Sequence, residues 1–295
     1  MRLSLGPNLF YWSKEDTLAF YRDMVDTAID IFYLGEAVCS KRKQMRTQDW
    51  FDLADELQSK GKEVVLSTLA LNEADSDIKT MKRICDNEKF MVEANDMGAV
   101  SLLEGKAFVT GHSVNTYNQH TIKLLAGLGL KRWVMPLELS KETLADLLAE
   151  KPAEVEAEIF AFGRIPLAYS ARCYTARAHN LQKDDCQYRC IDYPDGMLLN
   201  TQEEQKFLNL NGIQTLSAQT YNLLPEIETM KQMGVDILRL SPQYRHMNKV
   251  IDLFDQCNNQ QLSINEANSQ LEKLLTTDSC NGYWYGDAGI ASKAS

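Results

Sequence analysis

Short apolar runs alternate along the chain with segments in which apolar residues recur every three or four positions. The runs have the length of buried strands, and the segments between them have the periodicity of amphipathic helices. We predict strands at residues 2–5, 29–34, 63–69, 98–103, 106–110, 131–135, 155–161 and 235–240, and a strand or hairpin at 206–217; a second apolar run, 165–169, leads into the cysteine segment. We predict helices after Ser13 and at about 48–59, 76–87, 117–127, 140–150, 221–232, 244–257 and 264–275.

This alternation of strand and helix is typical of repeated βα units. About eight of the predicted strands are well defined, so a (β/α)8 TIM-barrel-like fold is our first choice and a doubly wound sheet is the alternative. No long linker interrupts the pattern, and we expect residues 1–295 to form a single domain. A cysteine-rich insertion lies at about 170–200, and two helices and a tail occupy about 244–295.

Composition narrows the possible functions. The formal net charge is −10 and the pI is near 5.0, which disfavours nucleic-acid binding through a broad basic surface. We find no apolar run with the length of a signal peptide or a transmembrane helix, so we expect a cytoplasmic protein. Seven cysteines, an odd number, also fit thiols kept reduced in the cytosol better than a disulfide framework.

Three of the seven cysteines, Cys173, Cys186 and Cys190, occur as C-x12-C-x3-C in a polar and charged stretch where core packing does not explain them. A thiolate-rich site selects zinc or an iron–sulfur cluster, and both normally take four ligands. The fourth ligand must therefore come from elsewhere, and Cys39 and Cys280 are the candidates. The sequence lacks the C-x2-C pairs that are usual in zinc sites, which weakens zinc. Free thiols or a redox pair are the remaining alternatives.

Chemistry in barrels and doubly wound sheets gathers where the carboxyl ends of the strands meet. Cys39 follows the predicted strand 29–34, whereas Cys280 lies in the tail, so element placement favours Cys39 without excluding Cys280. Cys85 and Cys257 fall within predicted helices, and we interpret them as packed or surface thiols.

Other polar residues also lie near strand ends. For Glu36, His112, Glu138 and Arg239 we favour structural roles such as hydrogen bonds, salt bridges or loop anchors. The basic run 41–46 is interpreted as a solvated face, although it can also lower a thiolate pKa or bind an anion. No P-loop, G-x-G-x-x-G, H-E-x-x-H or G-x-S-x-G motif occurs.

Several longer phrases point to a known family. YLGEAVCSKR, LSTLAL, LAYSARCYTAR with the C-x3-C that follows, LNGIQTLS, RLSPQ and CNGYW resemble ubiquinone-biosynthesis members of the collagenase-like peptidase family, over about residues 3–285. The resemblance implies a barrel that binds one [4Fe–4S] cluster. It matches the ligands to Cys39, Cys173, Cys186 and Cys190, and so selects Cys39 over Cys280.

The resemblance also implies a function and partners. It predicts a subunit of an oxygen-independent system that hydroxylates the aromatic ring of the polyprenyl-phenol quinone precursor. The expected partners are a homologous UbiU-like cluster protein, forming a heterodimer, and a UbiT-like lipid-binding accessory protein. A metal- or cluster-stapled binding module is the alternative, and RNA-base hydroxylation or peptidase activity is less favoured. Because residues 174–192 carry little apolar surface, we expect them to be disordered without the metal.

Overall fold

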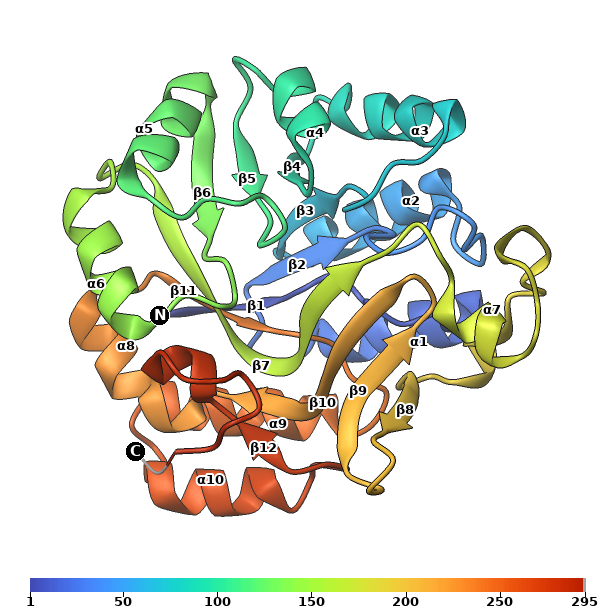
Figure 1. Cartoon of the computed structure of the whole chain (residues 1–295). Helices are drawn as coiled ribbons and strands as arrows, with labels where there is room; N and C mark the ends of the chain where they lie inside the picture. The colour runs from blue at the N-terminus through green and yellow to red at the C-terminus, as the bar shows by residue number, and fades with distance from the viewer. Residues whose placement is uncertain (294–295) are drawn as a thin grey trace.

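A computed structural model describes residues 1–293 of the chain and contains a closed barrel of eight parallel strands (Figure 1). Each strand pairs in parallel with the next, and β11 closes the ring between β7 and β1. The TIM-barrel-like prediction is confirmed. The barrel strands are β1 (Arg2–Leu5), β2 (Ile31–Leu34), β3 (Glu63–Ser67), β4 (Met91–Ala94), β5 (Phe108–Thr110), β6 (Leu130–Val134), β7 (Glu156–Tyr169) and β11 (Ile237–Leu240).

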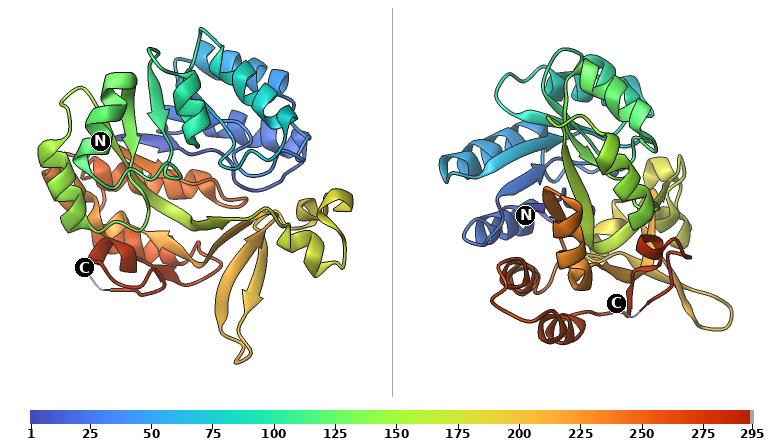
Figure 2. Two further views of the ribbon diagram at one scale, coloured as in Figure 1. Left: turned by 45° about the horizontal axis from the view of Figure 1, so that its top comes forward. Right: turned by 90° about the vertical axis from the view of Figure 1, so that its left-hand side faces the viewer.

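A helix follows each barrel strand and covers the outside of the barrel (Figures 1 and 2). Several begin where the sequence predicts, because a side chain caps the first turn; Ser13, for example, accepts a hydrogen bond from the backbone N–H of Asp16. These helices are α1 (Lys14–Met24), α2 (Thr47–Ser59), α3 (Asp75–Cys85), α4 (Met97–Leu102), α5 (Gln119–Leu128), α6 (Lys141–Glu150), α8 (Ile227–Met233) and α9 (Met247–Asn258). A further helix, α10 (Ile264–Glu272), follows α9.

Strand β7 runs on beyond the barrel and starts a second, antiparallel layer. Its outer part pairs with β10 (Gln214–Asn222), which pairs with β9 (Lys206–Asn211) and then β8 (Met197–Asn200). In Figure 2 the β8–β9 hairpin projects away from the barrel, beside the short helix α7 (Tyr174–Ala178). The short strand β12 (Ser279–Cys280) pairs with β10. This layer carries the cysteine-rich segment and joins it to the barrel.

The barrel interior contains a buried ionic network. Arg239 on β11 is 2% exposed and forms ion pairs with Glu93 on β4 at 2.6 Å and with Glu158 on β7 at 2.7 Å. Its guanidinium carbon lies 4.0 Å from the centre of the Tyr33 ring. Buried charges are tolerated when they are paired and hydrogen-bonded, and this network links four barrel strands.

Two sequence predictions were wrong in detail. Residues 98–103, predicted as a strand, belong to helix α4, because Asp96 caps it by accepting the N–H of Ala99. The strand is the short β4 just before it, which the sequence pattern missed. Residues 221–232, predicted as one helix, contain the end of β10, a 3-10 turn (Leu224–Glu226) and part of α8. Within residues 1–293, no helix is long and apolar enough to cross a bilayer.

Candidate metal centre

The four cysteines that the family resemblance matches to cluster ligands lie around one small cavity of about 20 Å³. Cys39 comes from the loop after β2, Cys173 from the start of α7, and Cys186 and Cys190 from the segment that follows α7. Cys280 does not line this cavity; it is buried in β12, opposite Tyr221. Among residues 1–293, no group of three or more His, Cys, Asp or Glu is arranged to hold a single metal ion.

The loop that carries Cys39 is fixed by Glu36. One carboxylate oxygen of Glu36 accepts the backbone N–H of Val38 at 2.9 Å and that of Cys39 at 3.0 Å. The loop starts at Gly35, where φ is 147° and an added Cβ would lie 2.4 Å from the carbonyl oxygen of Ser67. Only glycine fits this close passage between β2 and β3. The loop that carries Cys39 therefore starts at a fixed point on the edge of the barrel.

Cys173 lies at the start of α7 and its sulfur accepts the N–H of Ala176 at 3.4 Å. The helix is attached to the β9–β10 hairpin, since Tyr174 donates its N–H to the carbonyl of Gly212 and Thr175 accepts the N–H of Gly212. Asn211 pairs with Gln214, so the hairpin turns at Gly212-Ile213, and Gly212, at φ 67°, supplies the glycine that a two-residue turn favours at its first position. The second layer therefore holds Cys173 in place.

Cys186 directly follows a single-turn 3-10 helix, Lys183–Asp185, and Cys190 lies in a second one, Arg189–Asp192. Between them, Gln187 and Tyr188 have positive φ values of 49° and 54°. Such left-handed residues reverse the chain sharply, so both thiols reach the same cavity. Lys41 ties this segment to the Cys39 loop, because its Nζ donates to the carbonyl of Lys183 at 3.0 Å.

Arg42 is the buried cation of the site. Its Nη1 donates to the carbonyl oxygen of Leu9 and its Nη2 to Asn211 Oδ1, both at 2.6 Å. Glu36 lies 3.6 Å from Nη1. The side chain is 1% exposed and lines the cysteine cavity, yet its buried Nε has no hydrogen-bond partner among residues 1–293. A charged donor is thus available beside the four thiols.

Burial and charge oppose each other at these thiols. Burial raises the pKa of the Cys39 thiol to about 11, and the Arg42 guanidinium acts in the opposite direction. Burial also raises the pKa of Cys190, again against Arg42. Four thiolates in one cavity repel one another, so a fixed cation beside them lowers the cost of gathering their negative charge.

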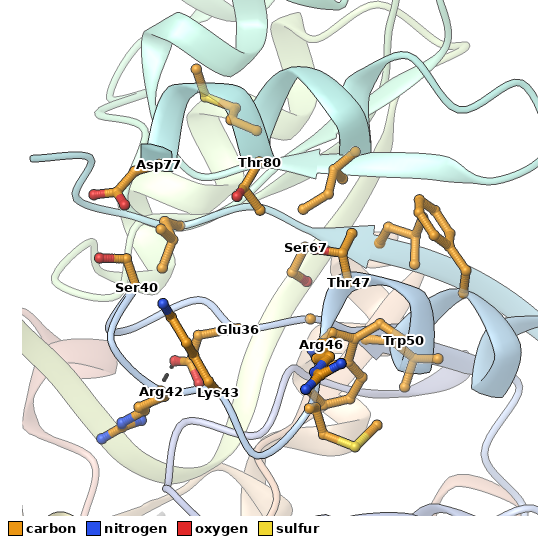
Figure 3. A pocket seen from close by; sticks show the side chains of 18 of the residues that line it. Glu36, Ser40, Arg42, Lys43, Arg46, Thr47, Trp50, Ser67, Asp77 and Thr80 are labelled. Atoms are coloured by element: carbon orange, nitrogen blue, oxygen red, sulfur yellow. Dashed lines mark ion pairs between the residues drawn. The ribbon is translucent and has the colours of Figure 1, made fainter. Parts of the chain in front are cut away.

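A larger cavity of about 380 Å³ lies beside this centre, between α2 and α3 (Figure 3). Trp50, Phe51, Met81 and Ile84 line it from the two helices. Glu36 lines its other end, with Arg42 and Lys43 from the loop after β2, and Arg46, the N-cap residue of α2, lines it near Trp50 (Figure 3). The cavity therefore shares the Arg42 side chain with the cysteine cavity.

Comparison with known families agrees with this architecture. The model of the family described as peptidase family U32 matches residues 17–293. The chain belongs to peptidase family U32. The resemblance to the collagenase-like peptidases is therefore confirmed for the family as a whole.

A curated relative of this U32 chain is the tRNA hydroxylation protein P of Haemophilus influenzae (strain ATCC 51907 / DSM 11121 / KW20 / Rd), 29% identical over 119 residues. The alignment covers 39% of this chain and 25% of the relative, so it spans about a quarter of that protein's length. Among solved structures, the U32 peptidase Mk0906 has a TM-score of 0.45 at 12% identity and covers 82% of this chain and 93% of its own. Dihydropteroate synthase (FolP) of Thermus thermophilus has a TM-score of 0.43 at 12% identity, covering 86% and 94%.

Most of the other candidates have structural surroundings, but both buried ring nitrogens of His112 lack a hydrogen-bond partner among residues 1–293, so the expected hydrogen-bonded role is wrong for this residue. Cys85 and Cys257 are packed thiols, 0% and 3% exposed, as the sequence predicted. Arg239 forms the salt bridges described above, and Glu138 accepts a hydrogen bond from Tyr117. Burial lowers the pKa of His112 to about 3, which keeps its ring neutral at physiological pH.

Sequence reasoning missed two features of the site. The basic run predicts a solvated face, but Arg42 is buried. Its hydrogen-bond partner Asn211 is 169 residues away in the sequence, so no local pattern indicates the burial. The 380 Å³ cavity was also missed, since its lining comes from two helices, the ends of two strands and the two loops that follow these strands. Neither feature leaves a local signal in the sequence.

Proposed function

We propose that the chain is a UbiV-type [4Fe–4S] protein, in which Cys39, Cys173, Cys186 and Cys190 ligate the cluster. In this proposal it is a subunit of an oxygen-independent system that hydroxylates the aromatic ring of the quinone precursor in ubiquinone biosynthesis. The observation that carries the proposal is the meeting of four thiols, from two distant parts of the chain, around one cavity beside buried Arg42.

The donor set fits the cluster. Thiolates are the ligands that iron–sulfur clusters require, and hydrogen bonds to the cluster sulfurs tune it. Arg42 Nε, which is buried without a partner among residues 1–293, is a donor for such a bond. A cluster held by four thiolates supplies one-electron transfer when bound. In the proposed centre Glu36 orients Cys39, and the β9–β10 hairpin orients Cys173.

The reaction class is supported by the Haemophilus relative, whose name states tRNA hydroxylation. The net charge of −10 disfavours RNA as the substrate here, because a surface of that sign repels phosphates. The cavity beside the thiols has apolar walls, which favour an apolar substrate. We therefore assign hydroxylation of the polyprenyl-phenol ring, not of an RNA base.

The proposal includes partners and a location. A UbiU-like homologue forms the heterodimer, and a UbiT-like lipid-binding protein delivers the polyprenyl-phenol. We place the complex in the cytoplasm. Co-purification of the chain with a UbiU-like protein under anaerobic conditions tests the heterodimer, and recovery of the chain alone in a strain that produces both proteins would contradict it.

A complementation experiment tests the function. In a host that makes ubiquinone without oxygen, deletion of the gene abolishes anaerobic ubiquinone synthesis. The parent and Cys257→Ala restore it, whereas Cys173→Ala and Cys186→Ala do not. Cys257 is the matched control because it is a buried thiol in α9, outside the cysteine cavity. An unchanged quinone profile in the deletion strain, with an altered set of modified RNA nucleosides, would contradict the proposal.

A further inference from the structure

The 380 Å³ cavity between α2 and α3 has the size and the composition of a small-molecule site (Figure 3). Ligand pockets usually measure about 300–1,000 Å³ and combine mainly apolar walls with a few convergent polar groups. Here the apolar wall comes from Trp50 and Phe51 on α2, Met81 and Ile84 on α3, and Leu69 after β3. These side chains favour an elongated apolar or aromatic ligand.

The other end of the cavity offers unsatisfied polar groups. Glu36 uses one carboxylate oxygen to bind the Cys39 loop, and its second oxygen has no hydrogen-bond partner among residues 1–293. Elsewhere in the lining, where the Asn72 amide lies against Met81, Asn72 Oδ1 is buried and has no partner within the described chain. A buried polar atom without a partner is costly, so Asn72 Oδ1 is an acceptor prepared for a donor group on a ligand. The Glu36 side chain is 22% exposed, and its second oxygen is free to accept such a donor as well.

The same end also carries positive charge. Lys43, which Figure 3 shows beside Glu36, lines the cavity, is exposed and forms no ion pair within residues 1–293. A phenolic hydroxyl satisfies both requirements, because it donates to a carboxylate or amide oxygen and accepts from a cation. A plain hydrocarbon satisfies neither.

The polar end is next to the cysteine centre. Ser40, the neighbour of Cys39, lines the cavity, and Arg42 lines both this cavity and the one formed by the cysteines. Figure 3 shows Glu36 and Arg42 paired at this end, with α3 above the opening. A ring bound at the polar end is therefore next to the loop that carries Cys39 and Arg42.

We propose that this cavity binds the prenylated phenol, with the ring at Glu36 and Lys43 and the isoprenoid chain along α2 and α3. The inference rests on the proposed function and locates its substrate. The chain leaves past Ser76 and Thr80, the exposed α3 residues that line the cavity. Glu36 then contacts both partners of the reaction centre, the substrate ring and the Cys39 loop.

Direct binding tests the site. The probe is a farnesylated phenol, titrated anaerobically into the purified protein while tryptophan fluorescence is recorded. Trp50 lines the cavity, whereas Trp12, Trp133 and Trp284 are each at most 3% exposed and do not. We expect saturable quenching of tryptophan fluorescence that Trp50→Phe removes. Unprenylated phenol lacks the isoprenoid chain and farnesol lacks the phenol ring, so each should bind at least about tenfold more weakly.

A pair of variants on α3 locates the binding. Thr80→Trp places an indole in the cavity and is expected to weaken binding at least about tenfold. Ile78→Trp adds the same side chain to the same helix at an exposed position that does not line the cavity, and should leave the affinity within about twofold. Equal affinity of the parent and Thr80→Trp would overturn the inference.

A covalent readout does not depend on these variants. A farnesylated phenol with a diazirine on its chain should label peptides from 47–51 and 76–84, and labelling confined to other segments would overturn the site. The outcome that would contradict the cavity differs from the one that would contradict the proposed function. If the deletion strain loses ubiquinone while Thr80→Trp both binds the probe normally and restores synthesis, the function stands and the cavity is wrong.

Discussion

The barrel and the cysteine segment, residues 171–200, are built in opposite ways. Every residue of β2, β5 and β11 is buried, and the charges inside the barrel are paired. Between residues 171 and 200 only Thr175 and Ala176 are buried, and the segment is held by 3-10 turns, backbone hydrogen bonds and the four-cysteine cavity. One region is stabilised by apolar burial and the other lacks it.

The difference indicates what stabilises the folded conformation of each region. A region that buries an apolar core is stable without a ligand, whereas a polar segment with few buried side chains gains most of its order from what it binds. Metal ligation supplies this order in small polar segments, since its binding free energy is also folding free energy. We therefore expect the barrel to survive loss of the cluster and the cysteine segment to open.

The largest expected effect is on the barrel. Arg239→Met leaves Glu93 and Glu158 without their shared buried cation, and breaking a buried pair costs about 3–5 kcal/mol. The free energy of unfolding, measured by urea denaturation of the metal-free protein, should fall by that amount. A loss below about 1 kcal/mol would contradict the role of the network.

An intermediate effect is expected where the two regions meet. Arg42→Met leaves the carbonyl of Leu9 and Asn211 Oδ1 without their charged donor, at a cost of about 1–3 kcal/mol. Because the same guanidinium lies beside the thiols, iron per chain should fall too. Lys43→Met, an exposed neighbour, is the matched control and should change neither quantity. If Arg42→Met retains as much iron as the parent, the guanidinium does not contribute to metal binding, which would contradict the prediction.

A local effect distinguishes the two regions directly. Limited proteolysis of the metal-free protein should cut first within residues 174–192, and the barrel fragments should stay folded by circular dichroism. The metal-loaded protein should resist cleavage there under the same conditions. Metal-free protein that is cut elsewhere and spared at 174–192 would contradict the dependence of the segment on its ligand.

The smallest effect belongs to the surface link between the Cys39 loop and the cysteine segment. Lys41 pairs with Asp184, whose side chain is 93% exposed. Exposed pairs are worth about 0.2–1 kcal/mol, so Asp184→Asn should lower stability by no more than that and leave iron content unchanged. Loss of iron in Asp184→Asn would mean that this contact, and not thiol ligation, orders the segment.

The sequence predicted the repeated features better than the local ones. The βα alternation and the convergence of Cys39 with the cysteine segment follow from periodicity and strand placement, or from the family resemblance. The strand at 91–94 was missed because it has four residues and lies directly before an apolar helix that Asp96 caps. Arg42 and the cavity between α2 and α3 depend on contacts between distant segments, which no local pattern records.

The most direct test of the four-thiol centre is the content of iron and acid-labile sulfide in protein purified without oxygen, measured beside Cys39→Ala. The account predicts about four iron and about four sulfide per chain in the parent and loss of both in the variant. Zinc alone, no metal, or an unchanged cluster in Cys39→Ala would contradict it.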